Sequence, residues 1–96
     1  MDSDAKLNIL IEALAAAGAS ALAIDGHGHV AISTMDDVAL EQDVAAFVAE
    51  RLGRVGNGAR LVMGHAGGRL SLTVRPGAKE YGELWVVVVR EVHGVA

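Results

Sequence analysis

Short apolar runs separated by charged and turn-forming residues organise this chain. The clearest run, residues 84–89, is Leu-Trp-Val-Val-Val-Val and contains no glycine or proline. Valine and tryptophan fit a pleated sheet, and a run of this length favours a strand over a helix. A strand that is apolar on both sides needs cover on both faces, which predicts a place at the centre of a sheet. Residues 21–24 have the same character and predict a second central strand.

Three other segments are predicted as strands that are polar on one side. In residues 69–75, leucine and valine alternate with arginine, serine and threonine, as they do in a half-buried strand. Residues 29–34 show a shorter alternation, and residues 60–63 lead into the glycine-rich turn at 64–68. The Asp-Gly pair and extra glycine at 25–28 are also turn residues. The strands are therefore expected to pair as hairpins.

Two segments carry apolar residues at helical spacing. The first helix is expected to begin at Ser3 or Asp4 and to end near Gly18, and the second to begin at Thr34 or Asp36. The apolar stripes are Leu7, Leu10, Ile11 and Leu14 in the first helix, and Leu40, Val44, Phe47, Val48, Leu52 and Val55 in the second.

One segment of the second helix admits two interpretations. Residues 38–42 either belong to the helix or form a short extra strand, with the helix then starting near Asp43.

The predicted order of elements is α-ββ-α-βββ, a single α+β domain over residues 1–96. The two strands that are apolar on both sides belong in the middle, and hairpin partners are usually neighbours. These conditions predict a five-stranded antiparallel sheet in the order 2-1-5-4-3 with two helices. Because two helices leave part of a face or an edge uncovered, we expect a homodimer.

Composition narrows the class of protein. Hydrophobic residues make up 52% and charged residues 21% of the chain, which indicates a folded domain. The absence of cysteine excludes disulfides, zinc–thiolate sites and cysteine nucleophiles. The net charge is −4 and the eight Lys and Arg are scattered, which argues against a nucleic-acid partner. No apolar run approaches the ~20 residues of a membrane span, and the acidic start is unlike a signal peptide, so we expect no membrane association and a cytoplasmic location.

The histidines are the main candidates for chemistry. His27 and His29 are two apart, and with His65 or His93 they could form a metal site. Their spacing matches no specific metal motif, and histidines flanked by glycine in turns are ordinarily solvated. We therefore predict no metal, and a small metal- or anion-binding domain is an alternative.

No catalytic constellation is expected elsewhere. No Gly-x-Ser-x-Gly elbow, phosphate loop or dinucleotide fingerprint occurs in the sequence. We predict a solvated face rather than a carboxylate pair for the acidic residues Asp36, Asp37, Glu41, Asp43 and Glu50. The protein is thus expected to have no enzymatic activity and no cofactor.

Three arginines can share one face of the last hairpins. Arg60, Arg69 and Arg75 could bind an anionic ligand or an acidic partner. We favour the alternative that they point outward and protect the sheet from edge-to-edge pairing.

Residues 18–33 resemble the opening of Roadblock/LC7 domains. In that family a helix leads into a small apolar strand, an Asp-x-x-Gly-like turn, here Asp25 and Gly28, and a strand ending in small polar residues. The next helix, the hairpin around residues 67–68 and the apolar last strand agree in order, and the family's sheet order is also 2-1-5-4-3. The family usually closes with a further helix, whereas this sequence ends at Ala96. The resemblance implies a homodimeric, non-enzymatic scaffold that binds small GTPases or signalling components.

A second resemblance is to small type III secretion chaperones. They also begin with a helix followed by an Asp-x-x-Gly turn, and this resemblance implies that the partner is a secreted effector protein. Residues 38–42 discriminate between the families, because a helix there favours the Roadblock/LC7 family and a strand favours the chaperones.

We predict that the dimer or partner surface lies on the second helix and the strand at 60–63. Its predicted residues are Val44, Phe47, Val48, Arg51, Arg60 and Val62. The alternative is that the apolar members of this set only cover the sheet.

Overall fold

The structure, a computed structural model, describes residues 20–77 and 84–92. Its strands are β1 (Ser20–Ile24), β2 (Val30–Ser33), β3 (Ala59–His65), β4 (Gly68–Pro76) and β5 (Trp85–Val92). Helix α2 (Val38–Ala49) and the short 3-10 helix η1 (Leu52–Arg54) lie between β2 and β3. The helix predicted to begin at Ser3 or Asp4 lies outside the described residues.

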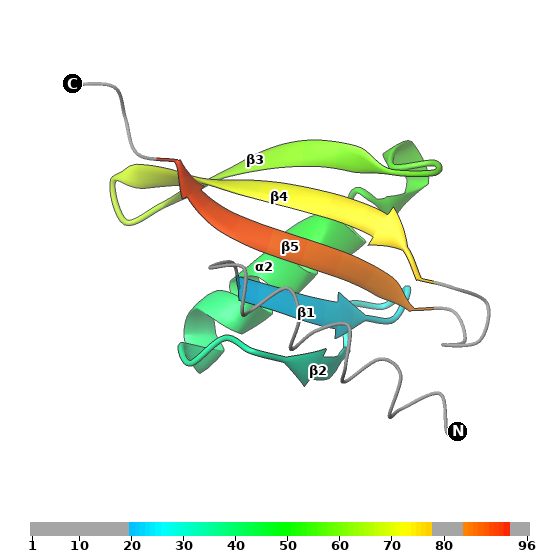
Figure 1. Cartoon of the computed structure of the whole chain (residues 1–96), viewed down its shortest axis with the longest axis horizontal. Coiled ribbons are helices and arrows are strands. Elements are labelled where there is room, and N and C mark those ends of the chain that lie inside the picture. The colour runs from blue at the N-terminus through cyan, green and yellow to red at the C-terminus, as the bar shows by residue number, and fades with distance from the viewer. Residues whose placement is uncertain (1–19, 78–83, 93–96) are drawn as a thin grey trace.

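The five strands form one antiparallel sheet in the order β2-β1-β5-β4-β3 (Figure 1), which confirms the predicted order and the α+β class. On β5, Val87 lies opposite Leu22 of β1 and Val74 of β4. The described residues contain one α-helix and one 3-10 helix, so the predicted pair of α-helices is not matched within them.

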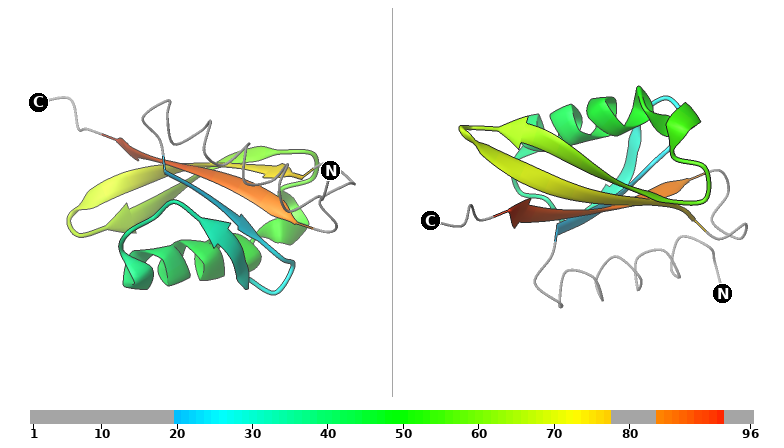
Figure 2. Two further views of the ribbon diagram at one scale, coloured as in Figure 1. Left: turned by 60° about the horizontal axis from the view of Figure 1, so that its bottom comes forward. Right: turned by 90° about the horizontal axis from the view of Figure 1, so that it is seen from above.

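Helix α2 covers one face of the sheet (Figure 2) and buries the main core there. Alternate residues of β1, β4 and β5 point toward the helix, as the period of a strand requires. The core residues are Leu22, Ile24, Val44, Ala45, Val48, Val55, Leu70, Leu72, Val74, Val87 and Val89. Each buried valine or leucine contributes about 1.5–3 kcal/mol, so this cluster is the main source of stability.

The centre of the opposite face is buried as well. Ala21 and Ala23 are 0% exposed and Val86 is 9% exposed, with Ile32 and Leu84 packed beside them. The two strands predicted to be covered on both sides are therefore covered on both sides.

The ambiguous segment at 38–42 is helical, because α2 begins at Val38. Asp37 is its N-cap, and Asp37 Oδ1 accepts a hydrogen bond from the N–H of Leu40 at 3.0 Å. The capping side chain thus satisfies one of the N–H groups that the first turn leaves without a partner.

The predicted start of this helix at Thr34 or Asp36 is wrong by a few residues. Thr34 Oγ1 instead accepts a hydrogen bond from the N–H of Ala21 at 3.0 Å and lies 3.3 Å from its carbonyl oxygen. Thr34 joins the loop to β1, so the helix begins only after the next cap residue. Within the described residues, no helix is long and apolar enough to cross a membrane.

Candidate functional site

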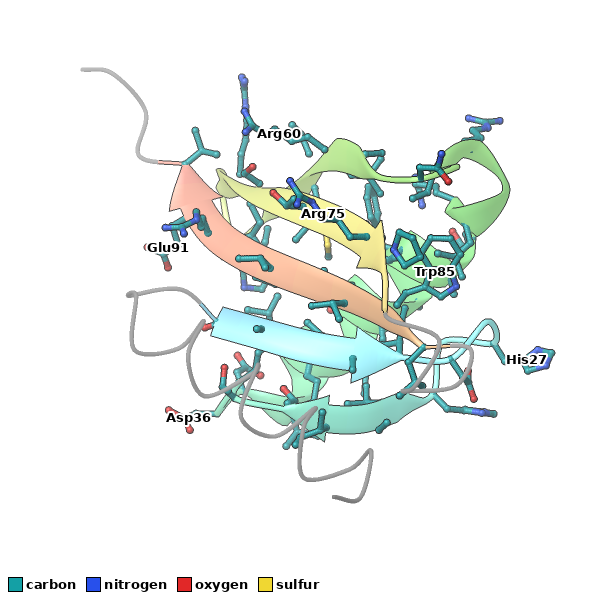
Figure 3. All side chains as sticks on the ribbon, turned by 45° about the vertical axis from the view of Figure 1, so that its right-hand side comes forward. His27, Asp36, Arg60, Arg75, Trp85 and Glu91 are labelled. Carbon is teal, nitrogen blue, oxygen red and sulfur yellow. The ribbon has the colours of Figure 1, made fainter. Side chains whose placement is uncertain are left out.

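The β1–β2 turn holds His27 and His29, two of the four histidines considered as metal ligands, and His93 lies outside the described residues. Asp25 Oδ1 accepts hydrogen bonds from the backbone N–H groups of His27, at 2.8 Å, and His29, at 3.0 Å. Asp25 Oδ2 lies 3.1 Å from Nδ1 of His29. His27 points away from the sheet at the tip of the turn (Figure 3). Both carboxylate oxygens of Asp25 therefore have partners within the turn and hold its backbone in place.

The same hydrogen bonds set the charge state of Asp25. The backbone N–H of His29 is the largest cause that holds the pKa of the Asp25 carboxyl below its ordinary value. Desolvation opposes this effect, while the N–H of His27 and the ring of His29 lower the pKa further. Donors favour the ionised form of a carboxyl group, so Asp25 is a carboxylate at neutral pH.

His65 lies at the other end of the sheet from these two histidines. It pairs with Gly68 at the β3–β4 turn, while the β1–β2 turn lies near the far end of β4. The nine residues of β4 span about 26 Å. The structure thus does not bring His27, His29 and His65 together, and in residues 20–77 and 84–92 no group of three His, Asp or Glu side chains could hold a metal ion.

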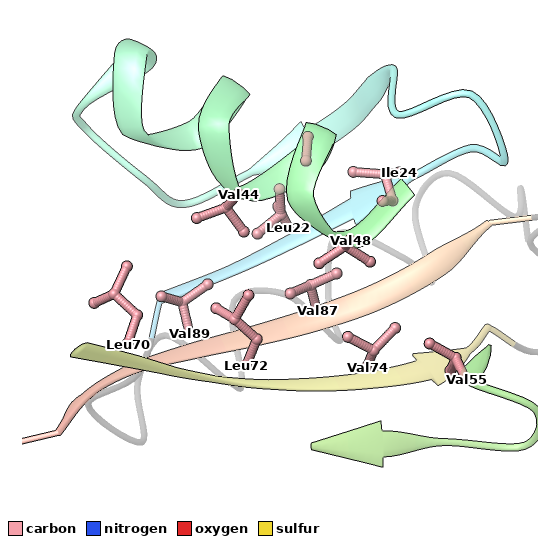
Figure 4. Close-up of a cluster of buried hydrophobic side chains, with 11 residues drawn as sticks. Leu22, Ile24, Val44, Val48, Val55, Leu70, Leu72, Val74, Val87 and Val89 are labelled. Atoms are coloured by element: carbon pink, nitrogen blue, oxygen red, sulfur yellow. The ribbon is translucent and has the colours of Figure 1, made fainter. Parts of the chain in front are cut away.

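Two of the predicted interface residues belong to the core. Val44 and Val48 are 0% exposed and point from α2 toward the sheet (Figure 4). A side chain with no exposed surface in one chain has none to offer a second chain, so the candidate surface is narrower than predicted.

Phe47 and Arg51 remain partly exposed at the C-terminal end of α2. The Arg51 guanidinium carbon lies 3.6 Å from the centre of the Phe47 ring, and Arg51 Nη1 donates to the Phe47 carbonyl oxygen at 2.8 Å. Nη1 also lies 3.4 Å from Oε2 of Glu50. The cation therefore caps the last turn of the helix and stacks on the aromatic ring.

The edge strand β3 is incompletely covered by its own chain. On the inner face of β4, Leu70, Leu72 and Val74 are buried. On the neighbouring inner face of β3, Leu61 and Met63 contact the core but are only half-buried. An apolar strip therefore remains partly open along the side of the sheet where, among the described strands, β3 has no neighbour.

The outer face of β3, β4 and β5, opposite α2, is basic. Arg69 and Arg75 alternate with the buried residues of β4, so they point to this face, and both are exposed. Arg60 of β3 and Arg90 of β5 are exposed on the same face, opposite Thr73 and Ser71 respectively. The described acidic residues lie elsewhere, in the β1–β2 turn, around α2 and at Glu91, which alternates with Arg90.

Part of this basic face is hollowed. An open depression of about 460 Å³ lies beside the start of β3. It is lined by Asn57, Gly58, Ala59, Arg60, Thr73 and Arg75. The lining therefore includes two arginines, a threonine and an asparagine, a set of residues that suits a negatively charged group.

No protein-family model, curated protein or solved structure matches the chain. The geometry of the described residues gives two parts of a candidate site: the open edge of β3 and the basic face next to it. Sequence reasoning included Arg60, Val62, Phe47 and Arg51 in its candidate surface but missed Arg90. The sequence contained the signal for Arg90. This residue lies two residues after Val88 and four after Val86, so it is on the same side of β5 as these two valines.

Proposed function

We propose that this protein is a small, non-enzymatic, homodimeric module for protein interactions, joined through the edge of β3. The observation that carries the proposal is the half-buried strip of Leu61 and Met63 beside an edge strand of seven residues. A second copy that pairs there would bury the strip and use the unpaired backbone groups of β3. Edge strands left open are otherwise a route to aggregation.

The sequence of β3 suits antiparallel pairing with a second copy of itself. With the two-fold axis at Val62, Val62 lies opposite its copy and Arg60 lies opposite Gly64. Val62 is 56% exposed, so the contact buries apolar surface. The two arginines are not placed face to face, and each lies opposite a residue without a side chain. The paired sheet would then have ten strands, in an interface that is the same on both subunits.

The helix at residues 38–42 supports the Roadblock/LC7 resemblance over the chaperone resemblance. The sheet order 2-1-5-4-3 also agrees with that family. The Asp25–Gly28 turn that carries the resemblance is closed by the N–H of Gly28, which donates to the Asp25 carbonyl at 3.2 Å. The proposal includes the predicted first helix, a cytoplasmic location and a protein partner of the small-GTPase or signalling class, with a secreted effector as the second candidate.

The test uses a proline at the centre of the open edge. The pair His65–Gly68 flanks the two-residue turn and is hydrogen-bonded, and bonded and non-bonded pairs alternate from there along the hairpin. The pair Val62–Ser71 is therefore non-bonded, so the backbone N–H of Val62 points away from β4. Val62→Pro therefore removes a donor for a second copy and spares the pairing with β4. We expect the wild-type protein to sediment as a dimer at tens of micromolar and Val62→Pro to sediment as a monomer with an unchanged far-ultraviolet spectrum.

Val62→Thr is the matched control, because threonine keeps the N–H, the β-branch and nearly the same volume. It should remain a dimer. A wild-type monomer at tens of micromolar refutes the homodimer, and a dimeric Val62→Pro refutes the edge of β3 as the contact.

A further inference from the structure

Three of the four arginines on the outer face are not placed to protect the edge of the sheet. Arg69 and Arg75 lie on β4, which is flanked by β3 and β5, and Arg90 lies on β5, which is flanked by β4 and β1. Of the four, Arg60 alone is on an edge strand. Edge protection requires a charge on the strand that has an open edge. The explanation favoured from the sequence for Arg60, Arg69 and Arg75 therefore fails for Arg69 and Arg75.

The basic face also carries apolar side chains that are not covered. Val62 is 56% exposed and Val92 is 44% exposed, and both alternate with residues that face α2. Val92 pairs with Arg69, and Val62 pairs with Ser71, which pairs with Arg90. Exposed arginines interspersed with exposed valines are typical of a protein interface, where arginine is enriched and the centre is apolar.

We infer that the outer face of β3, β4 and β5 is a docking surface for an acidic segment of a partner protein. Arg69 and Arg75 are six residues apart on one strand, so their Cα atoms are separated by about 20 Å. A segment of at least six extended residues, with Asp or Glu at intervals, spans this distance. Its carboxylates would bind the guanidinium groups, one of them in the hollow between Arg60 and Arg75.

The distribution of charge favours an acidic partner over a second copy of this chain. The chain carries a net charge of −4, yet the described acidic residues lie off this face. A face of the opposite sign to the whole molecule attracts acidic groups locally, while the molecule as a whole repels them. This arrangement favours one orientation of the partner.

Two other anionic partners fit the face less well. A single inorganic phosphate would fill one hollow and would leave Arg69 and Arg90 without a partner. Single-stranded nucleic acid is ordinarily held by aromatic side chains that stack on bases, and the outward residues of β3, β4 and β5 include none. Aliphatic side chains such as Val62 and Val92 instead suit the apolar residues of a peptide.

This inference rests on the proposed function in one respect, that the partner is a protein. It does not depend on the homodimer, because one chain supplies all the strands of the face. In the proposed dimer the two basic faces would lie on the same side of the joined sheet. Binding to the face is therefore tested separately from self-association.

The test measures the binding of a fluorescein-labelled peptide of twelve alternating Glu and Val residues by fluorescence anisotropy at low salt. We expect the double variant Arg69→Gln, Arg75→Gln to bind at least about fivefold more weakly than the wild-type protein. Arg54→Gln is the control, because Arg54 is an exposed arginine of η1 that lies on none of the three strands and does not line the hollow. It should bind the peptide as the wild-type protein does.

Four outcomes decide against the inference. Equal affinity of the double variant and the wild-type protein overturns it. So does tighter binding of a single-stranded oligonucleotide than of the peptide, or full competition by millimolar inorganic phosphate. If the double variant loses self-association in sedimentation, the face contacts a second copy instead. A monomeric protein that binds the peptide as expected refutes the homodimer and leaves this inference standing.

Discussion

At the scale of single residues, the β1–β2 turn is held in place by the backbone and the small size of Gly28. Gly28 has a φ of +86°, a conformation that residues with a side chain rarely adopt. A Cβ at this position would lie 3.1 Å from Cβ of Ala49 and 3.4 Å from the Ala45 carbonyl oxygen. The turn thus packs directly on the last turns of α2, and glycine is needed both for its backbone and for its size.

Gly28→Ala is expected to destabilise the protein by about 2 kcal/mol, because it combines an unfavourable φ with a close contact. Urea denaturation measures the change. Gly26→Ala is the control, since a Cβ at Gly26 meets nothing within 4 Å, and it should change stability by no more than about 0.5 kcal/mol. Equal effects of the two substitutions would contradict the role of Gly28.

Asp25 makes this turn sensitive to acid. The pKa of its carboxyl is lowered in the folded state from 3.8, chiefly by the backbone N–H of His29. A lowered pKa stabilises the folded state above the unfolded value, and this stabilisation is lost as the pH falls through the folded pKa. Asp25→Ala should therefore destabilise the protein at pH 7, and the difference from wild type should shrink below pH 3.8.

Urea midpoints at successive pH values measure this difference. Asp25→Asn is the control, because asparagine keeps an acceptor oxygen for the two N–H groups and does not titrate. Its stability should fall less with acid than that of the wild-type protein. If both fall equally, Asp25 is not the group responsible.

At the scale of elements, α2 joins the two halves of the sheet through its buried face. Val44 and Val48 pack in one core with residues of β1, β4 and β5. Because β1 and β4 belong to different hairpins, the helix links parts of the sheet that neither hairpin links. Phe47 and Arg51 lie toward the margin of the helix and remain partly exposed. The helix therefore has a buried face, which stabilises the fold, and a partly exposed margin, which a partner can reach. The predicted interface contained residues of both.

Val48→Ala should cost about 2 kcal/mol, because it leaves a cavity in a fully buried site. Val48→Glu should unfold the chain, since it buries an unpaired carboxylate. Val38→Ala is the control, because Val38 is 62% exposed and its loss should change stability by no more than about 0.5 kcal/mol. Urea denaturation with circular dichroism distinguishes these outcomes, and a folded Val48→Glu monomer would instead place Val48 in an interface.

At the scale of the whole molecule, the two faces of the sheet have different chemistry. The face under α2 is a continuous apolar core, while the opposite face is apolar at β1 and basic over β3 and β4. Net charge and composition are averages over both faces, so a chain with a net charge of −4 can still present a basic surface. The proposed dimer and the proposed acidic partner act at this scale, and each depends on surface that one chain leaves open.

The strands, their inward and outward residues and their order in the sheet could be predicted from the sequence. Residues 21–24 and 84–89 are apolar on both sides, and the requirement to cover both faces placed them at the centre. That inference succeeds because the period of a strand and the burial of apolar side chains are local properties. The N-cap at Asp37 was missed by one to three residues, because several neighbouring polar residues can cap a helix and tertiary contacts choose among them.

Only the tertiary structure decided which side chains come together. His27 and His65 both lie in glycine-rich turns, yet the sheet places them at opposite ends. Arg69, Arg75 and Arg90 come from two strands, and their meeting on one face depends on the register between β4 and β5. Val48 and Val62 are the same residue type in apolar segments, but one is buried under α2 and the other is open at the edge. Local sequence determines the side of an element on which a residue lies, while the neighbouring elements determine whether that side is covered.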